Sequence, residues 1–314
     1  MGTHLVIGAG PVGSAAARLL AGDGHAVVVV TRSGSGPEQP GIRRVAADAS
    51  SVDVLLAAAP AADAIYNCAN PAYHRWPQDW PPLAASLLSY AERTGAVLAT
   101  CSNLYGYGPV DGPITEGYPL AATGEKSRVR VQMWRNAKAA HDAGRLRVTE
   151  VRGSDYLYAG EQSLIGSSRV VPRILAGRSV SLLGSVDAPH SWTAPVDAAR
   201  LLVACAADQR AWGSAWHVPS NPPRTQRQVV DDLAATAGVP PVRVSALSPV
   251  LVRVLGLFNP AIRELAETSY QRDRAFVIDD TAARTAFGME PTLWPDILRG
   301  VIAHYRQGEG AAHA

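Results

Sequence analysis

The sequence predicts an α/β protein with a doubly wound parallel sheet, and two observations support this prediction. An apolar strand at 5–7 runs directly into the motif Gly8-Ala9-Gly10-Pro11-Val12-Gly13, and a helix of small residues follows at 14–21. Strand-like and helix-like segments then alternate as far as residue 152. Alternation of this kind is typical of parallel strands covered by helices on both faces.

The elements are expected in a regular order along the chain. Strands are predicted at 5–7, 26–31, 43–46, 64–68, 96–101 and 147–152, with helices at 14–21, 51–58, 81–93 and 126–143. Beyond residue 155 the segments become rich in Gly and Pro, with helices expected at 196–205, 226–237, 250–268 and 293–306 and a strand at 242–245. We therefore expect a first domain over 1–155 together with about 190–215, a smaller interleaved lobe over 156–189 and 216–307, and a disordered tail over 308–314.

Composition narrows the possible functions. The 314 residues carry a net charge of +2 and no run of Lys and Arg, so no nucleic-acid partner is expected. The apolar stretch at 249–258 is interrupted by Arg253 and is too short to span a bilayer, so no membrane is expected either. The three cysteines lack a metal-ligand spacing, and the chain opens on its first strand. We expect a cytoplasmic protein without a metal.

The glycine motif predicts a dinucleotide site in a Rossmann fold. Gly8 makes the tight turn, Gly10 allows the backbone to approach a pyrophosphate, and Gly13 allows the helix to pack on the strand. Pro11 suits the first helical turn, where Val12 and its neighbours present free N–H groups to an anion.

The end of the second strand indicates which dinucleotide is preferred. NAD-preferring domains carry a carboxylate there that binds the ribose 2′-hydroxyl, whereas this chain has Val30-Thr31-Arg32-Ser33. Arg32 suits a 2′-phosphate, so NADP(H) is favoured over NAD(H). The alternative is that Arg32 is simply solvated.

Several further motifs carry a resemblance to a known family. They include Asn67-Cys68-Ala69 after the fourth strand, Leu104-Tyr105-Gly106 after the fifth, and His190-Ser191-Trp192. Together with the glycine motif they resemble the extended short-chain dehydrogenase/reductase family of epimerases and dehydratases, over about residues 5–305. The resemblance implies a substrate lobe beside the Rossmann domain, with Asp48 near the adenine and Ala69 and Asn70 near the nicotinamide. The alternative for Asp48 is a turn carboxylate.

The sequence departs from the family at the catalytic pair. The family places a Ser or Thr four residues before its conserved tyrosine, and here that position is Cys101, followed by Ser102. The family's Tyr-x-x-x-Lys falls on Lys126 and Arg130. We expect Arg130 to hold a ribose or phosphate. We expect Lys126, pushed towards its neutral form, to replace tyrosine in proton transfer, with Ser102 or Thr100 orienting the substrate oxygen. Alternatively, both are solvated helix residues, both bind a substrate carboxylate while the chemistry occurs elsewhere, or acid/base catalysis has been lost.

Aromatic and His side chains mark the expected substrate side. The segment 71–80 is expected to be a loop over the cleft or a dimer contact. The substrate-binding candidates are Tyr73, His74, Trp76, Tyr105, Tyr156, His190 and Trp192.

The leading hypothesis is therefore an NADP(H)-dependent oxidoreductase acting on a small carbonyl or alcohol. Alternatives are an epimerase or dehydratase that recycles its hydride, a non-redox isomerase or cyclase, and a non-catalytic NADP-binding regulator. The resemblance also implies a homodimer through the helices at 81–93 and 126–143.

Overall fold

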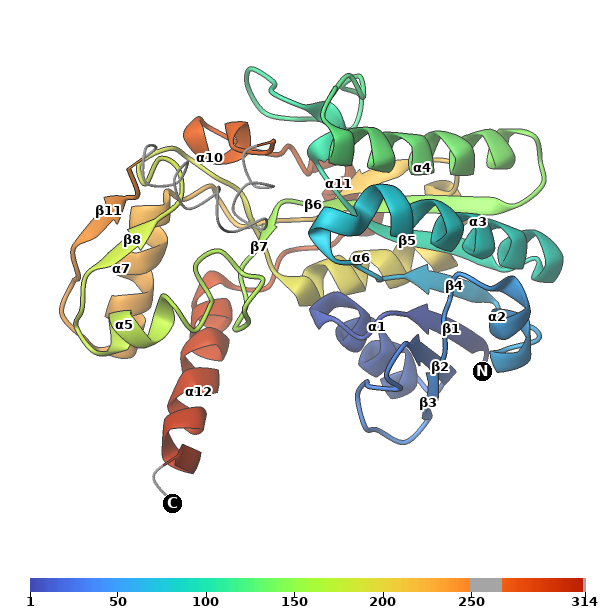
Figure 1. The fold of residues 1–314 in the computed structure, drawn as a ribbon, viewed down its shortest axis with the longest axis horizontal. Helices are drawn as coiled ribbons and strands as arrows, with labels where there is room; N and C mark the ends of the chain where they lie inside the picture. The colour runs from blue at the N-terminus through green and yellow to red at the C-terminus, as the bar shows by residue number, and fades with distance from the viewer. Residues whose placement is uncertain (249–266, 313–314) are drawn as a thin grey trace.

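The chain folds into two lobes of unequal size (Figure 1). The computed structural model describes residues 1–248 and 267–312. The larger lobe contains a seven-stranded sheet in the order β10-β6-β5-β4-β1-β2-β3. Every neighbouring pair in this sheet is parallel. The strands are β1 Thr3–Ile7, β2 Ala26–Thr31, β3 Ile42–Ala46, β4 Ala64–Asn67, β5 Val97–Asn103, β6 Arg147–Gly153 and β10 Ala215–His217.

The strand order reverses between β1 and β4, which confirms the doubly wound prediction. From β1 the chain adds β2 and β3 on one side, and then β4, β5 and β6 on the other. In open sheets of this type, ligands bind outside the carboxyl ends of the strands at such a reversal. The glycine motif follows β1 directly and therefore lies at this point.

Helices cover both faces of the sheet (Figure 1). One face packs against α1 (Pro11–Gly22) and α6 (Pro195–Ala207). The other packs against α2 (Val52–Ala58), α3 (Trp76–Thr94) and α4 (Glu125–Asp142). Side chains alternate along each strand, so Val6 faces the first set of helices and its neighbours Leu5 and Ile7 face the second.

The smaller lobe is joined to the larger through a two-stranded pair that follows β6. Its own core gathers apolar residues from between Leu157 and Ile302. A capping box at Thr225 and Gln228 begins helix α7. The elements of this part of the chain are β7 Asp155–Tyr156, α5 Val171–Leu175, β8 Val180–Leu182, β9 Trp192–Thr193, α7 Gln226–Ala237, β11 Val244–Ala246, α10 Tyr270–Asp273 and α12 Trp294–Ala312.

The domain boundaries differ from the expected ones in two places. Strand β10 belongs to the central sheet, and α11 (Thr281–Phe287) packs beside it, with Ala283 in the core under α1 and α6. The expected first domain ended at about residue 215, at the start of β10, and α11 was expected in the smaller lobe. Residues 308–312, expected to be disordered, continue helix α12. The helix expected at 250–268 lies outside the described residues except for its last two positions, which form a turn.

Helix α3 begins at Trp76, five residues before its expected start, even though it contains Pro81 and Pro82. Pro77 suits its first turn, and an ion pair between Arg75 and Asp79 (2.7 Å) lies over that turn. The segment expected to be a loop is therefore a short 3₁₀ turn, Tyr73–Arg75, followed by helix. No helix in the described part of the chain is both long and apolar enough to cross a membrane.

Candidate active site

The glycine turn has the geometry that dinucleotide binding requires. Gly8 has a φ of +92°, and a Cβ there would lie 2.7 Å from the carbonyl oxygen of Cys68. A Cβ at Gly13 would overlap the carbonyl oxygen of Gly8, whereas one at Gly10 would meet no atom of the described part of the chain within 4 Å. Gly8 and Gly13 therefore serve the packing of the turn, and Gly10 leaves an open surface at the N-terminus of α1. The residues present fit a bound pyrophosphate.

The end of β2 and the end of β3 face the expected adenosine side. Arg32 is exposed, and no described residue forms a hydrogen bond or ion pair with its guanidinium. Asp48 accepts hydrogen bonds from the backbone N–H (2.9 Å) and hydroxyl (2.8 Å) of Ser50, and these bonds lower the pKa of its carboxyl. One oxygen of Asp48 is thus used by a local turn, as the alternative expectation proposed.

The ends of β4 and β5 bring two cysteines to the same side of the sheet. Asn67 pairs with Thr100 in the register of these strands, so Cys68 and Cys101 follow as the next pair. Both pack partly against the core under α1 and α6. Ala69 is half-buried and Asn70 is exposed beside them. This edge adjoins the glycine turn, because Gly8 touches Cys68.

Ser102 lies on the opposite face of the sheet from Cys101. Successive side chains of a strand alternate in direction, so only one of the two can face the glycine turn. Ser102 is buried and lines a small cavity with Arg130 and Glu150. Cys101 is therefore the residue that lies on the cofactor side.

Lys126 is buried and its ammonium is paired. Its side chain is 3% exposed, and Nζ lies 3.4 Å from Oε2 of Glu267 and 4.8 Å from the centre of the Tyr73 ring. The other carboxylate oxygen of Glu267 accepts from the backbone N–H of Lys126 at 2.9 Å. A carboxylate at this distance favours the charged form of an amine. Glu267, which lies 141 residues from Lys126 in the sequence, places a carboxylate beside an amine that was expected to be neutral.

Arg130 lies against α3 between two indole rings. Its guanidinium carbon is 4.6 Å from the centre of the Trp76 ring and 4.2 Å from that of Trp80. Burial lowers the pKa of Arg130, and the charge of Glu150 opposes this shift. Its Nε and Nη1 atoms are buried and form no hydrogen bond with a described residue. These two donors are suited to an anionic or ribose group.

The aromatic substrate candidates form a packed cluster rather than an open loop. Trp76 is 2% exposed, stacks on Tyr105 at 5.9 Å between ring centres, and donates from Nε1 to the carbonyl of Pro71 at 3.1 Å. Tyr73 packs edge-on against Trp76 at 5.0 Å, and His74 is exposed. Burial raises the pKa of Tyr105 well above its ordinary value. Of these residues, Tyr73 also contacts Lys126.

His190 and Trp192 lie at the junction of the lobes. His190 is buried, with Nε2 3.2 Å from Asp155 and Nδ1 3.1 Å from the carbonyl oxygen of Gln271. Burial tends to raise the pKa of the Asp155 carboxyl, but the hydrogen bond and charge of His190 outweigh it and hold that pKa below its usual value. Trp192 is buried in the core of the smaller lobe, and its indole donates to the carbonyl of Arg224. This placement favours packing for Trp192.

A buried polar chain behind the site was not predicted from the sequence. Arg152 donates to Glu150 at 2.7 Å and to the hydroxyl of Tyr107 at 2.6 Å, and that hydroxyl lies 2.9 Å from Nε2 of His217. His217 Nδ1 lies 2.9 Å from the carbonyl oxygen of Asp279, so it carries the proton and Nε2 accepts from Tyr107. No spacing in the sequence marks these partners, which lie up to 110 residues apart.

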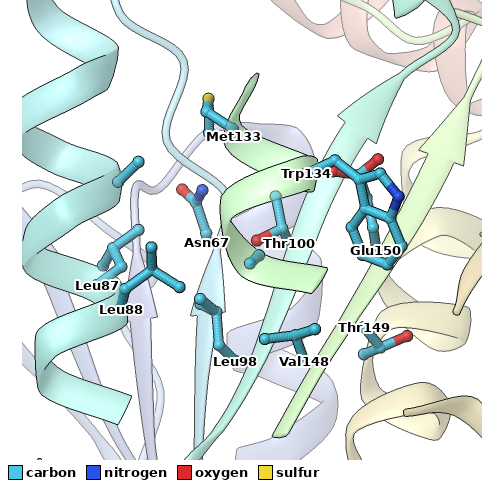
Figure 2. A pocket seen from close by; sticks show the side chains of 12 residues that line it. Asn67, Leu87, Leu88, Leu98, Thr100, Met133, Trp134, Val148, Thr149 and Glu150 are labelled. Carbon is cyan, nitrogen blue, oxygen red and sulfur yellow. The ribbon is translucent and has the colours of Figure 1, made fainter. Parts of the chain in front are cut away.

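A cavity lies between the central sheet and the helices α3 and α4, and Glu150 of the polar chain lines it (Figure 2). Thr100 and Glu150 contribute polar atoms to its wall, and Leu87, Leu88 and Trp134 contribute apolar ones. It lies on the same face of the sheet as Ser102 and away from the glycine turn. Among the described residues, no group of three or more His, Cys, Asp or Glu side chains is placed to hold a metal ion.

Solved structures with the same architecture include enzymes from three organisms. A dTDP-glucose 4,6-dehydratase from Bacillus anthracis, solved with NAD, has a TM-score of 0.78 and 17% identity over 99% of this chain and 98% of its own. An epimerase from Methanothermobacter thermautotrophicus has a TM-score of 0.80 and 16% identity over 99% of this chain and 94% of its own. A UDP-glucose 4-epimerase from Thermotoga maritima, solved with UDP-glucose, has a TM-score of 0.77 and 16% identity over 98% of this chain and 99% of its own.

At these identities the structural likeness shows the fold alone, and no curated protein has a matching sequence. The family model of the NAD dependent epimerase/dehydratase family, however, matches residues 4–217, which include the glycine turn, Cys101, Lys126 and all of the central sheet except Thr3. The chain therefore belongs to the NAD dependent epimerase/dehydratase family of enzymes.

Proposed function

We propose that this protein transfers hydride between NADP(H) and a small-molecule carbonyl or alcohol. The observation that carries the choice of dinucleotide is the exposed Arg32 at the end of β2, where an NAD-preferring domain has a carboxylate. A guanidinium there matches the charge and geometry of a 2′-phosphate. The cofactor supplies the hydride, and the chain supplies its binding surface at Gly8, Gly10 and the N-terminus of α1.

Lys126 takes a different part in this proposal from the one that the sequence suggested. Its ammonium is paired with Glu267 and provides a positive charge close to Tyr73. Such a charge holds a substrate oxygen or carboxylate and stabilises negative charge that develops there. Nearby, Arg130 offers Nε and Nη1, which form no hydrogen bond with a described residue, to a ribose or phosphate oxygen.

Titration of the purified protein with NADPH, NADP, NADH and NAD tests the choice of cofactor. We expect NADPH to bind at least tenfold more tightly than NADH. The substitution Arg32→Ala should remove most of that difference without lowering the affinity for NADH. Arg18→Ala, an arginine on the outer surface of α1, is the matched control. Equal binding of NADPH and NADH, or a preference that persists in Arg32→Ala, contradicts the proposal.

A second candidate, an epimerase or dehydratase that recycles its hydride, is favoured by family membership and by the dehydratase and epimerase among the similar structures. Such an enzyme retains its dinucleotide in one redox state through purification. The absorbance band of reduced nicotinamide, measured on the freshly purified protein before and after denaturation, distinguishes the two candidate functions. Tightly retained cofactor together with no net NADPH consumption on carbonyl compounds favours the second candidate.

A further inference from the structure

The site contains a tyrosine hydroxyl that the family motif does not supply. Tyr156 Oη lies 3.4 Å from Sγ of Cys101, the residue that stands where the family has a Ser or Thr. Tyr156 comes from β7, just after β6, whereas the family's catalytic tyrosine would come from α4. The hydroxyl and the thiol are close enough for one to donate to the other.

The local backbone holds Tyr156 in this position. Strand β7 pairs with β9, with Tyr156 opposite Thr193. Gly153 makes room for the hydroxyl, because a Cβ at that position would lie 2.8 Å from Oη. The ring packs partly against the same core as Ala9 of the glycine turn and Cys68. Through Cys101 and the neighbouring Cys68, whose carbonyl lies against Gly8, the hydroxyl is on the side of the sheet that carries the glycine turn.

The electrostatic surroundings keep this hydroxyl protonated. Burial raises the pKa of Tyr156 well above its ordinary value, Cys101 adds to the shift, and Arg130 opposes it. Burial raises the pKa of the Cys101 thiol as well. Both groups are thus neutral proton carriers near neutral pH, and Arg130 provides a positive charge that stabilises a phenolate if one forms.

We propose that Tyr156 is the proton donor to the substrate oxygen, with Cys101 positioning its hydroxyl. The proposal rests on the proposed hydride transfer. When hydride adds to the carbonyl carbon, the C=O π bond breaks, its electron pair moves to oxygen, and oxygen takes the proton of Tyr156. The phenolate then recovers a proton from water. One hydride and one proton convert the carbonyl to an alcohol, and the dinucleotide is oxidised by two electrons.

This assignment accounts for the lost Tyr-x-x-x-Lys pair without requiring Lys126 to give up a proton. The Lys126 ammonium is engaged with Glu267, whereas the hydroxyl of Tyr156 lies against the thiol of Cys101. The same three kinds of group that the family uses, a phenol, a small polar side chain and a cation, are present as Tyr156, Cys101 and Arg130. They come from β7, β5 and α4.

The test compares Tyr156→Phe with Tyr305→Phe, which removes a partly buried tyrosine hydroxyl from α12 that donates to Gly166. The first readout is the near-ultraviolet absorbance of tyrosinate, titrated with pH with and without NADP. The positively charged nicotinamide of NADP should lower the pH at which one tyrosine ionises, in the wild type and in Tyr305→Phe. That shift should be absent from Tyr156→Phe.

The second readout is NADPH oxidation with a panel of small aldehydes and ketones. General acid catalysis contributes about 100-fold to 10,000-fold, so Tyr156→Phe should lower kcat by about 100-fold or more with little change in KM or NADPH affinity. Cys101→Ser should retain activity within about tenfold and Cys101→Ala should lose more, because only serine preserves a hydrogen-bonding partner.

The outcomes separate this proposal from the proposed function. If the wild type binds no dinucleotide, hydride transfer itself fails. If the wild type binds NADP but Tyr156→Phe keeps both the ionisation shift and the activity, Tyr156 is not the donor. Tighter binding of NADPH by Tyr156→Ala than by the wild type, with activity retained, would show that the ring obstructs the nicotinamide pocket and would also overturn the assignment.

Discussion

The carboxylate of Glu267 binds the first turn of α4 and the side chain of Lys126 at the same time. Oε1 accepts from the backbone N–H groups of Lys126 (2.9 Å) and Ser127 (3.4 Å), and Oε2 lies 3.4 Å from Lys126 Nζ. The helix N-cap, Gly124, has no side chain to do this. A distant carboxylate thus replaces the missing cap, and the positive end of the helix dipole favours it.

Removing the charge of Glu267 should destabilise the protein. Glu267→Gln keeps the size of the side chain but weakens three contacts of a largely buried group, so we expect the free energy of unfolding to fall by about 1–3 kcal/mol. Denaturant unfolding measures this. Asp142→Asn, which removes an exposed ion pair with Lys138 on the same helix, should cost less than about 1 kcal/mol. Equal losses in the two variants would contradict the structural importance of Glu267.

Substitution of Lys126 should separate substrate binding from proton transfer. In the proposed function its ammonium holds a substrate oxygen, so Lys126→Met should raise KM for a carbonyl substrate about tenfold or more, with NADPH affinity unchanged. Lys126→Arg keeps the charge and should lose less. Steady-state kinetics of the two variants measures this. A variant Lys126→Met with unchanged KM and kcat would remove Lys126 from the site.

Alanine substitutions at two glycines of the turn should have different effects on stability and on cofactor binding. In Gly10→Ala the added methyl group meets no atom of the described residues within 4 Å, so the melting temperature should match the wild type while NADPH binding weakens by about tenfold or more. Gly13→Ala overlaps the carbonyl of Gly8, so it should lower both stability and binding. Thermal melts and cofactor titrations of the two variants test this. Undiminished NADPH binding by Gly10→Ala would place the pyrophosphate elsewhere.

The buried His217 should make stability depend on pH. Burial lowers the pKa of His217, although Glu116 and the Asp279 carbonyl oppose the shift. Below about pH 6.5 the unfolded chain binds a proton that the folded protein does not, so stability falls as the pH falls, by up to about 1.4 kcal/mol per pH unit for one group. Unfolding free energies at about pH 7.5 and about pH 5 measure this.

His217→Gln should be less stable at the higher pH, because it disrupts the bonds to Tyr107 and Asp279. Its free energy of unfolding should also fall less between the two pH values than that of the wild type. Part of the slope should remain, since burial also lowers the pKa of His4. A slope identical to that of the wild type would show that His217 does not take up the proton on unfolding.

Local sequence determined the frame of this protein. The glycine motif, the apolar runs of β1, β2 and β4, and the alternation of strands and helices depend on neighbours along the chain, so the parallel sheet and the dinucleotide turn were predictable. The start of α3 was not, because Pro81 and Pro82 suggest a boundary that the packing of Trp76 and Trp80 overrides.

Only the tertiary structure decided the chemistry of the site. Because side chains alternate along β5, Cys101 lies on the side of the glycine turn and Ser102 on the opposite side. The pairing of β7 with β9 places Tyr156 beside Cys101, which lies 55 residues earlier in the sequence. Glu267 reached Lys126 across 141 residues and gave its ammonium a partner. Burial and charge pairs set the protonation of such groups, and both arise from contacts between segments that are far apart in sequence.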